Sequence, residues 1–267
     1  MVIIMADNDI IHVAIEPQGK LDDALINTIS EIINKNPWDT RLILAGEIPK
    51  IITHYKNIEL ANQTVAKINA LGIQSLAIGD TELHRSSPSF KAQTLKILGE
   101  QIVFHDDSGS AKTVPANGIF LILVGRHEAS VISETTTIKT KFDMAGTLLT
   151  GGIPMWRRVK EKNTNESIET TFFIRLYENN LSGTWIELNQ KQINYVFLGK
   201  LVAPSTLVNF NTMLQQLRDF FPNSIYDDRL TRPSVMSESS SQPWHNLDAY
   251  CQLAYLFHRR ERNSKPA

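Results

Sequence analysis

The most regular pattern of hydrophobic and polar positions lies in the last third of the chain, before Pro222. Three short apolar runs, at 171–177, 184–188 and 193–198, predict strands. Apolar residues then recur three or four apart, which places them on one face of a helix from about Thr206. These residues are Leu207, Phe210, Leu214, Leu217 and Phe221. Pro222 ends the helix, and its apolar face must be buried, most simply against the strands before it.

The N-terminal third alternates between strand and helix patterns. Strands are expected at 10–15, 51–55 and 73–78, and helices at 21–35 and 58–71. Residues 41–45 fit either a strand or a short helix. Asn57 suits the cap of the second helix and Gly72 its C-terminal end, so we expect a β-α-β unit over residues 51–78.

Two stretches of this region carry a resemblance to known families. They are Ile-Glu-Leu-Ala-Asn-Gln-Thr-Val-Ala-Lys-Ile-Asn-Ala-Leu-Gly-Ile at 58–73 and Gly-Glu-Ile-Pro at 46–49. They resemble the C-terminal domain of the ribosomal stalk protein and the adaptor of the Clp protease. The resemblance implies a small α/β domain that serves as a docking surface and not as a catalyst.

From residue 94 onward the pattern predicts mainly strands. Short runs at 95–98, 101–105 and 112–114 surround a turn at 106–110, and 119–124 reads as a core strand. Residues 129–138 are rich in β-branched side chains. The segment 139–169 shows no clear period and predicts a long loop, a feature that is usually functional or disordered.

These elements predict an α+β protein of two domains. Residues 1–90 form a small α/β sandwich, and residues 91–222 a β-rich, barrel-like domain closed by an amphipathic helix. The order of strands in the second domain is similar to that of the pleckstrin-homology-like barrel, with an α+β sandwich as the alternative. Residues 223–244 are a linker by composition, and 245–262 form a C-terminal helix. In its general texture the chain resembles bacterial proteins of regulatory or adaptor type.

Composition and charge narrow the class of protein. The 267 residues are 42% hydrophobic and 21% charged with a net charge of −1, which is typical of a soluble globular protein. This charge gives no long-range attraction to nucleic acid, which we do not expect as a partner. The single cysteine, Cys251, excludes an intrachain disulfide, so a reducing cytoplasm is the simplest compartment. The longest apolar run, 118–125, is too short to span a bilayer.

No short stretch of the sequence carries a recognisable motif for catalysis or for binding a metal or cofactor. The seven histidines are scattered, and His105 beside two aspartates sits at the predicted turn. The glycine-rich segment 146–152 lacks the lysine of a phosphate loop. For 227–229, Asp-Asp-Arg, local ion pairing accounts for the charges, and Cys251 falls on an apolar helical face where an inert buried thiol is expected. We therefore expect no cofactor and no metal.

The candidate binding residues are Trp156, Arg157 and Arg158 in the predicted loop. An aromatic ring beside two guanidinium groups is typical of protein-interface hot spots. The leading hypothesis is a non-enzymatic regulatory or adaptor protein that binds an unidentified protein partner. The alternative is an enzyme or sensor for a small anionic ligand, in which Arg126 joins the two arginines and His127 or His105 acts as acid or base.

Overall fold

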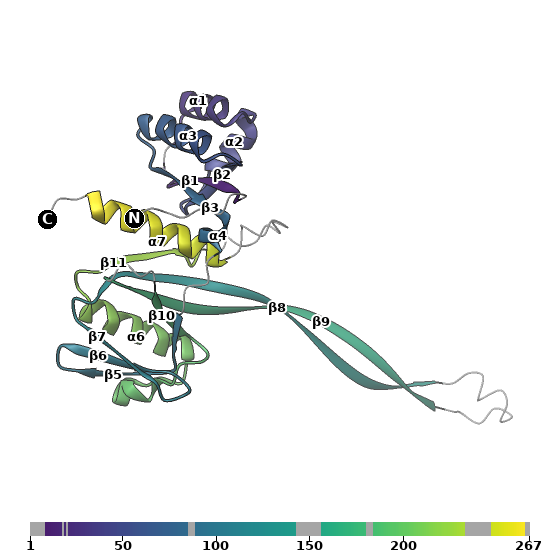
Figure 1. Cartoon of the computed structure of the whole chain (residues 1–267). Coiled ribbons are helices and arrows are strands. Elements are labelled where there is room, and N and C mark those ends of the chain that lie inside the picture. The colour runs from purple at the N-terminus through teal and green to yellow at the C-terminus, as the bar shows by residue number, and fades with distance from the viewer. Residues whose placement is uncertain are drawn as a thin grey trace. The chain divides into compact units, whose positions relative to one another are not determined.

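The computed structural model describes residues 9–17, 19, 21–84, 89–142, 156–179, 184–232 and 247–264 (Figure 1). It contains helices and three β-sheets, which confirms the predicted α+β class. The chain divides into two compact units: one contains residues 1–126 and 172–267, and the other residues 127–171. The domain boundaries expected at about 90 and 222 stay a prediction.

The first sheet has the strand order β2-β1-β3. Its strands are β1 (Ile11–Ile15), β2 (Lys50–Tyr55) and β3 (Ser75–Gly79). Because β1 is antiparallel to both neighbours, β2 and β3 run parallel with β1 inserted between them. The helices that belong to this part are α1 (Asp23–Ile33), α2 (Pro37–Leu44), α3 (Ile58–Ala70) and the short α4 (Asp80–Leu83). The predicted strands and helices of this region are confirmed, and the ambiguous residues at 41–44 are helical.

Alternation along β1 explains why this sheet is buried on both faces. Ile11, Val13 and Ile15 pack into one apolar cluster with Ile26, Ile29 and Ile68 of the helices α1 and α3. His12 and Ala14 take the intervening positions and therefore face the opposite side. Both are fully buried, so the second face is covered as well.

A five-stranded sheet has the order β11-β8-β9-β10-β4, and a separate three-stranded sheet has the order β5-β6-β7. The strands are β4 (Ser89–Ala92), β5 (Thr94–Leu98), β6 (Gln101–His105), β7 (Ala111–Pro115), β8 (Ile119–Phe142), β9 (Trp156–Glu178), β10 (Trp185–Asn189) and β11 (Ile225–Leu230). Among the described strands no closed barrel is formed. The expected barrel is therefore corrected to two open sheets.

The helix α6 (Thr206–Phe220) is confirmed, with Ser205 as its N-cap. Its buried side chains Phe210, Met213 and Leu217 join Ile122, Ile174 and Ile186 of the strands in one core. The strand expected at 193–198 is wrong, because residues Tyr195–Leu201 form the 3-10 helix η1. The side chain of Asn194 accepts a hydrogen bond from the backbone N–H of Val196 and starts this helical turn.

The loop expected at 139–169 is wrong for the residues that the structure describes. Residues 139–142 belong to β8 and 156–169 to β9, which are neighbouring strands. Their parts between 127 and 171 make up the second compact unit, in which the two strands wind around each other (Figure 1). The sequence of these parts lacks the alternation of apolar and polar residues that predicts a core strand.

The C-terminal helix α7 (Leu247–Ser264) is buried on two sides. Ala249, Leu253 and Phe257 pack with Ala14, Ile51 and Ile78 of the first sheet. Tyr250, Cys251 and Tyr255 pack with Phe120, Leu121 and Tyr177 of the five-stranded sheet. The helix expected at 245–262 therefore lies between the two sheets and contacts both.

The structure also corrects part of the expected linker. Residues Ile225–Leu230 form β11, which pairs in parallel with β8. The polar residues Asp227 to Arg229 do not indicate a strand in the sequence. They can lie in one because partners from other elements neutralise their charges. Residues 233–246 lie outside the described residues. Within the described part of the chain, no helix has the length and apolar character needed to cross a membrane.

Candidate functional site

The structure places the predicted binding residues on two strands. Arg126 is partly buried in β8, and His127, the next residue, is exposed. Trp156 is the first residue of β9 and is 65% exposed. Arg157 and Arg158 follow it in the strand, and their side chains lie outside the described residues. Trp156 is therefore exposed, and it lies on a strand and not in the expected loop.

The strand assignment reveals a charge pattern that a loop does not have. Residues 156, 158, 160 and 162 are at alternate positions of β9 and share one face of the strand. They are Trp156, Arg158, Lys160 and Lys162, and the side chains of Trp156 and Lys160 are exposed. Among the described side chains, this face of β9 thus presents an aromatic ring and a basic group, Trp156 and Lys160.

Charge is also unevenly distributed along the sequences of the two strands of the second unit. The end of β8 adds Lys139 and Lys141 to the basic residues at the start of β9. Most acidic residues lie toward the other ends, Glu128 and Glu134 in β8 and Glu166 and Glu169 in β9, whereas Glu161 lies among the basic residues of β9. These charges are present in the sequence. They fall on one face only if residues 156–162 form a strand, in which side chains alternate between two faces.

A chain of polar side chains crosses the first sheet. Nδ1 of the buried His12 lies 2.8 Å from Nδ1 of His54, its partner across β1 and β2. Nε2 of His12 lies 2.9 Å from Oδ1 of Asp80, and Nδ1 of His84 lies 3.3 Å from the same oxygen. Sequence analysis missed this cluster because its members come from β1, β2 and α4 and are far apart in the chain.

The partners of His12 determine its tautomer. A carboxylate only accepts hydrogen bonds, so Nε2 of His12 donates to Asp80. In neutral His12, Nδ1 is then the acceptor, and Nδ1 of His54 donates to it. The arrangement satisfies a fully buried imidazole at both nitrogens and links the middle strand of the sheet to α4.

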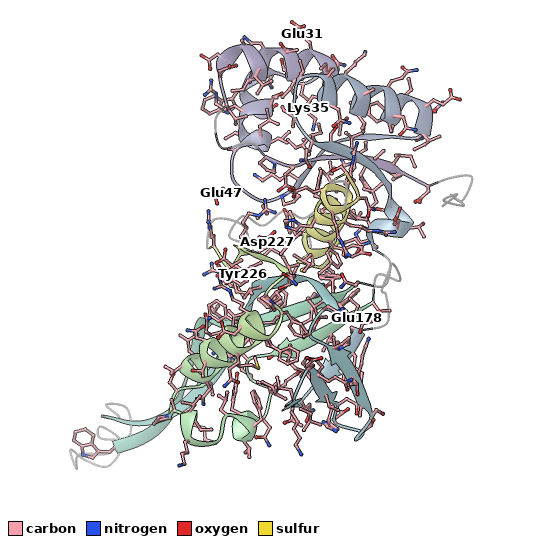
Figure 2. The ribbon with its side chains drawn as sticks, turned by 90° about the vertical axis from the view of Figure 1, so that its left-hand side faces the viewer. Glu31, Lys35, Glu47, Glu178, Tyr226 and Asp227 are labelled. Atoms are coloured by element: carbon pink, nitrogen blue, oxygen red, sulfur yellow. The ribbon has the colours of Figure 1, made fainter. Side chains whose placement is uncertain are left out.

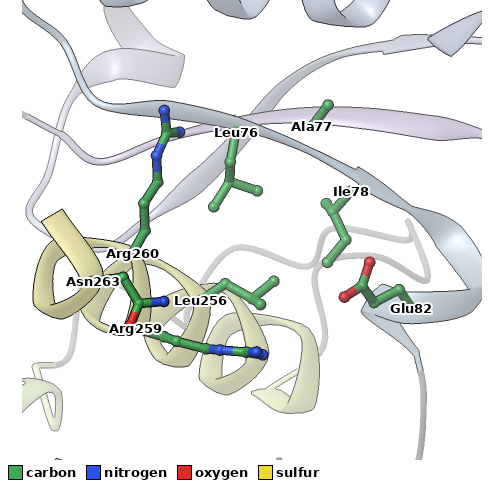
Figure 3. Close-up of a pocket in the computed structure, with 8 residues that line it drawn as sticks. All are labelled: Leu76, Ala77, Ile78, Glu82, Leu256, Arg259, Arg260 and Asn263. Atoms are coloured by element: carbon green, nitrogen blue, oxygen red, sulfur yellow. The ribbon is translucent and has the colours of Figure 1, made fainter. Parts of the chain in front are cut away.

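A pocket of about 320 Å³ lies between β3, α4 and α7 (Figure 3). Leu76 and Ile78 point from β3 toward α7, and Leu256 lies opposite them. The other lining residues are Ala77, Glu82, Arg259, Arg260 and Asn263. Ile78 is also the partner of His12 across β1 and β3, so the pocket adjoins the histidine cluster.

Asp227 and Arg229 form a partly buried ion cluster on β11, and Figure 2 labels Asp227. Two guanidinium nitrogens of Arg229 donate to the carboxylate at 3.0 and 2.7 Å, and Nε2 of His258 lies 2.8 Å from it. Arg229 also pairs with Glu16 and donates to the carbonyl of Glu47 at 2.9 Å. The predicted local pairing is thus confirmed, and the cluster extends it to the first sheet and to α7.

Burial alone would raise the pKa of Asp227, but hydrogen bonds from His258 and Arg229 outweigh it and hold this pKa well below its usual range. The pKa of Arg229 is raised despite burial, by Asp227 and Glu16. Each charge therefore stabilises the ionised form of the other. This cluster joins parts of the fold, and we assign it a structural role.

Cys251 is fully buried on α7, as predicted, and burial raises the pKa of its thiol to about 12. Beside it Arg175 donates to Glu187 at 3.1 Å and lies over the Trp185 ring at 4.9 Å. A thiol with so high a pKa is almost entirely protonated at neutral pH and is a poor nucleophile. The site is part of the core.

The remaining candidates from the sequence form a turn or lie outside the described residues. Oδ1 of Asp106 accepts hydrogen bonds from the backbone N–H groups of Ser108 and Ser110, which confirms a turn after His105. The segment 146–152 lies outside the described residues. Within the described ranges, no group of histidine, cysteine, aspartate and glutamate side chains could hold a metal ion.

Comparisons with family models, with curated proteins and with solved structures found no match to this chain. The resemblances to docking domains and to the pleckstrin-homology-like barrel therefore gain no support from them.

Proposed function

We propose that this protein is a non-enzymatic regulatory or adaptor protein that binds a protein partner through the strand pair 127–142 and 156–171. The observation that carries the proposal is the exposed Trp156 at the start of β9, with the exposed Lys160 at an alternate position of the same strand. Exposed tryptophan and arginine are the residues that contribute most to protein interfaces. A two-stranded ribbon is marginally stable alone, so a partner that covers it would stabilise it as well.

The charge pattern defines the surface that this partner presents. The basic residues around Trp156 complement carboxylates, and the acidic residues of the other half complement basic groups. A protein surface can offer both signs along one contact. A nucleic acid offers only phosphates, which the glutamates at 128, 134, 166 and 169 would repel, so a protein with an acidic patch fits better.

Other observations are consistent with an adaptor in the cytoplasm. The expected resemblance of the N-terminal part to docking domains belongs to the same function. The one cysteine is buried and needs no oxidising compartment. The alternative, a sensor or enzyme for a small anionic ligand, has its best support not at Arg126 and His127 but at the pocket beside α7.

The proposal is tested by capturing partners from the lysate of the source cells with three forms of the protein. They are the wild type, the variant Trp156→Ala/Lys160→Glu and the control Trp38→Ala/Lys56→Glu. Trp38 is 70% exposed on α2 and Lys56 is exposed, so the control makes the same chemical change elsewhere on the surface.

We expect one protein to be captured by the wild type and the control and lost by the ribbon variant. For the purified pair, the ribbon variant should raise Kd at least about tenfold, the scale of one interface hot spot. Equal capture by all three forms would contradict the proposal. Capture that disappears after nuclease treatment would replace the protein partner by a nucleic acid.

A further inference from the structure

The pocket beside α7 has an apolar floor. Leu76, Ile78 and Leu256 supply its hydrocarbon surface, and the cavity of about 320 Å³ falls at the lower end of the range of small-molecule sites. Figure 3 shows these three side chains directed toward the same space from β3 and α7. A ligand with a short hydrocarbon body would remove this surface from water.

The rim of the pocket is mainly cationic. Arg259 and Arg260 lie on α7, and Glu82 lies across from them on α4. One nitrogen of Arg260 donates to the carbonyl of Ser75, and one nitrogen of Arg259 lies 3.4 Å from the hydroxyl of Tyr255. A guanidinium has five N–H donors, so these contacts leave donors on both arginines for a ligand. Two cations against one carboxylate favour an anion.

We infer that this pocket binds a small carboxylate with an apolar body. Each arginine can bind a carboxylate with paired hydrogen bonds, and Figure 3 shows their guanidinium groups on different sides of the pocket. The leucine and isoleucine side chains match the hydrocarbon part. The inference uses only residues of the first unit and does not depend on the proposed function of the strand pair.

Octanoate is a suitable probe because it carries both features in a molecule that the cavity accommodates. Isothermal titration of the full-length protein should give saturable binding of octanoate. Its neutral analogue 1-octanol should bind at least about tenfold more weakly, since it lacks the charge that the arginines recognise. Equal affinity for the two molecules, or no saturation with octanoate, would overturn the inference.

Two substitutions should change the affinity in opposite directions. Arg259→Gln should raise Kd about fivefold, and Glu82→Gln should lower it about two- to fivefold because it removes a like charge. Arg262→Gln is the control on the same helix, since the guanidinium of Arg262 lies over the Phe120 ring at 5.5 Å and not in the pocket lining. An effect of the same sign for Arg259→Gln and Glu82→Gln would contradict a charge-selective site.

Discussion

His12 and His54 face each other across β1 and β2, with their Nδ1 atoms 2.8 Å apart. Two ring nitrogens at this distance share one proton, so one ring donates and the other accepts. Because Asp80 accepts a hydrogen bond from the other nitrogen of His12, neutral His12 is the acceptor in this pair. A fully buried residue on the middle strand thus connects β2 to α4.

Replacing His12 tests whether this chain of hydrogen bonds stabilises the fold. His12→Phe keeps an aromatic ring of similar size but removes both bonds. It should lower the free energy of unfolding by about 1–3 kcal/mol, the cost of leaving buried polar partners unsatisfied. Chemical denaturation measures this loss. His127→Ala, an exposed histidine, should change stability by less than about 0.5 kcal/mol. Equal effects of the two substitutions would contradict the role of His12.

Asp227 predicts how stability depends on acid. Its pKa in the folded protein lies below that of an unfolded aspartate, about 3.9, so its ionised form contributes stability that is complete above that value. The contribution is lost as the pH falls below about 4 toward the folded pKa, where the carboxylate takes up a proton. Asp227→Asn should therefore be less stable by about 1–3 kcal/mol at pH 7.

The pH dependence of the free energy of unfolding below about pH 5 distinguishes the loss of the Asp227 charge from a general loss of stability. Between about pH 5 and pH 2, the free energy of unfolding of Asp227→Asn should fall less steeply than that of the wild type. Identical slopes for wild type and Asp227→Asn would show that Asp227 is not held ionised by Arg229 and His258.

The thiol of Cys251 should be protected in the folded protein. With a pKa of about 12 and no exposed surface, it should not react with iodoacetamide at pH 8 unless the protein unfolds. Mass spectrometry should find one labelled site in denaturant and none in native buffer. In Ala111→Cys, an exposed position on β7, the added thiol should react rapidly. Rapid native labelling at Cys251 would contradict the burial of α7.

The helix α7 should couple the two sheets that it contacts. Leu253 packs toward the first sheet and Tyr255 toward the five-stranded sheet. Leu253→Ala should cost about 2–5 kcal/mol through the cavity that it leaves. If α7 couples the sheets, hydrogen exchange in this variant should speed up in both β1 and the buried part of β8. Faster exchange in β1 alone would show that the sheets unfold independently.

Patterns with a strong period predicted most local elements correctly. The helix α6 follows from the spacing of Phe210, Leu214 and Leu217, and α3 from its cap at Asn57. The strand residues 139–142 and 156–169 were not predicted because their sequence lacks the alternation of apolar residues that indicates a core strand. The strand β11 was not predicted because the charged residues Asp227 and Arg229 are typical of a loop. Their partners Glu16 and His258 are known only from the structure.

The candidate sites show the same limit. Trp156 was identified because it stands beside two arginines in the sequence. That it shares a face with Lys160 follows only from the strand assignment. The cluster of His12, His54 and Asp80 joins residues that are distant in the chain, and no local spacing reveals it. Periodicity predicts elements, whereas contacts between distant elements depend on the tertiary fold.

The most direct test of the account is photo-crosslinking from position 156. Benzoylphenylalanine would replace Trp156 in one form of the protein and the equally exposed Trp38 in a control form, both expressed in the source cells. The account predicts that position 156 crosslinks to one protein with an acidic surface, and that position 38 does not. No crosslink at 156, or the same products from both positions, would contradict a binding role for the strand pair.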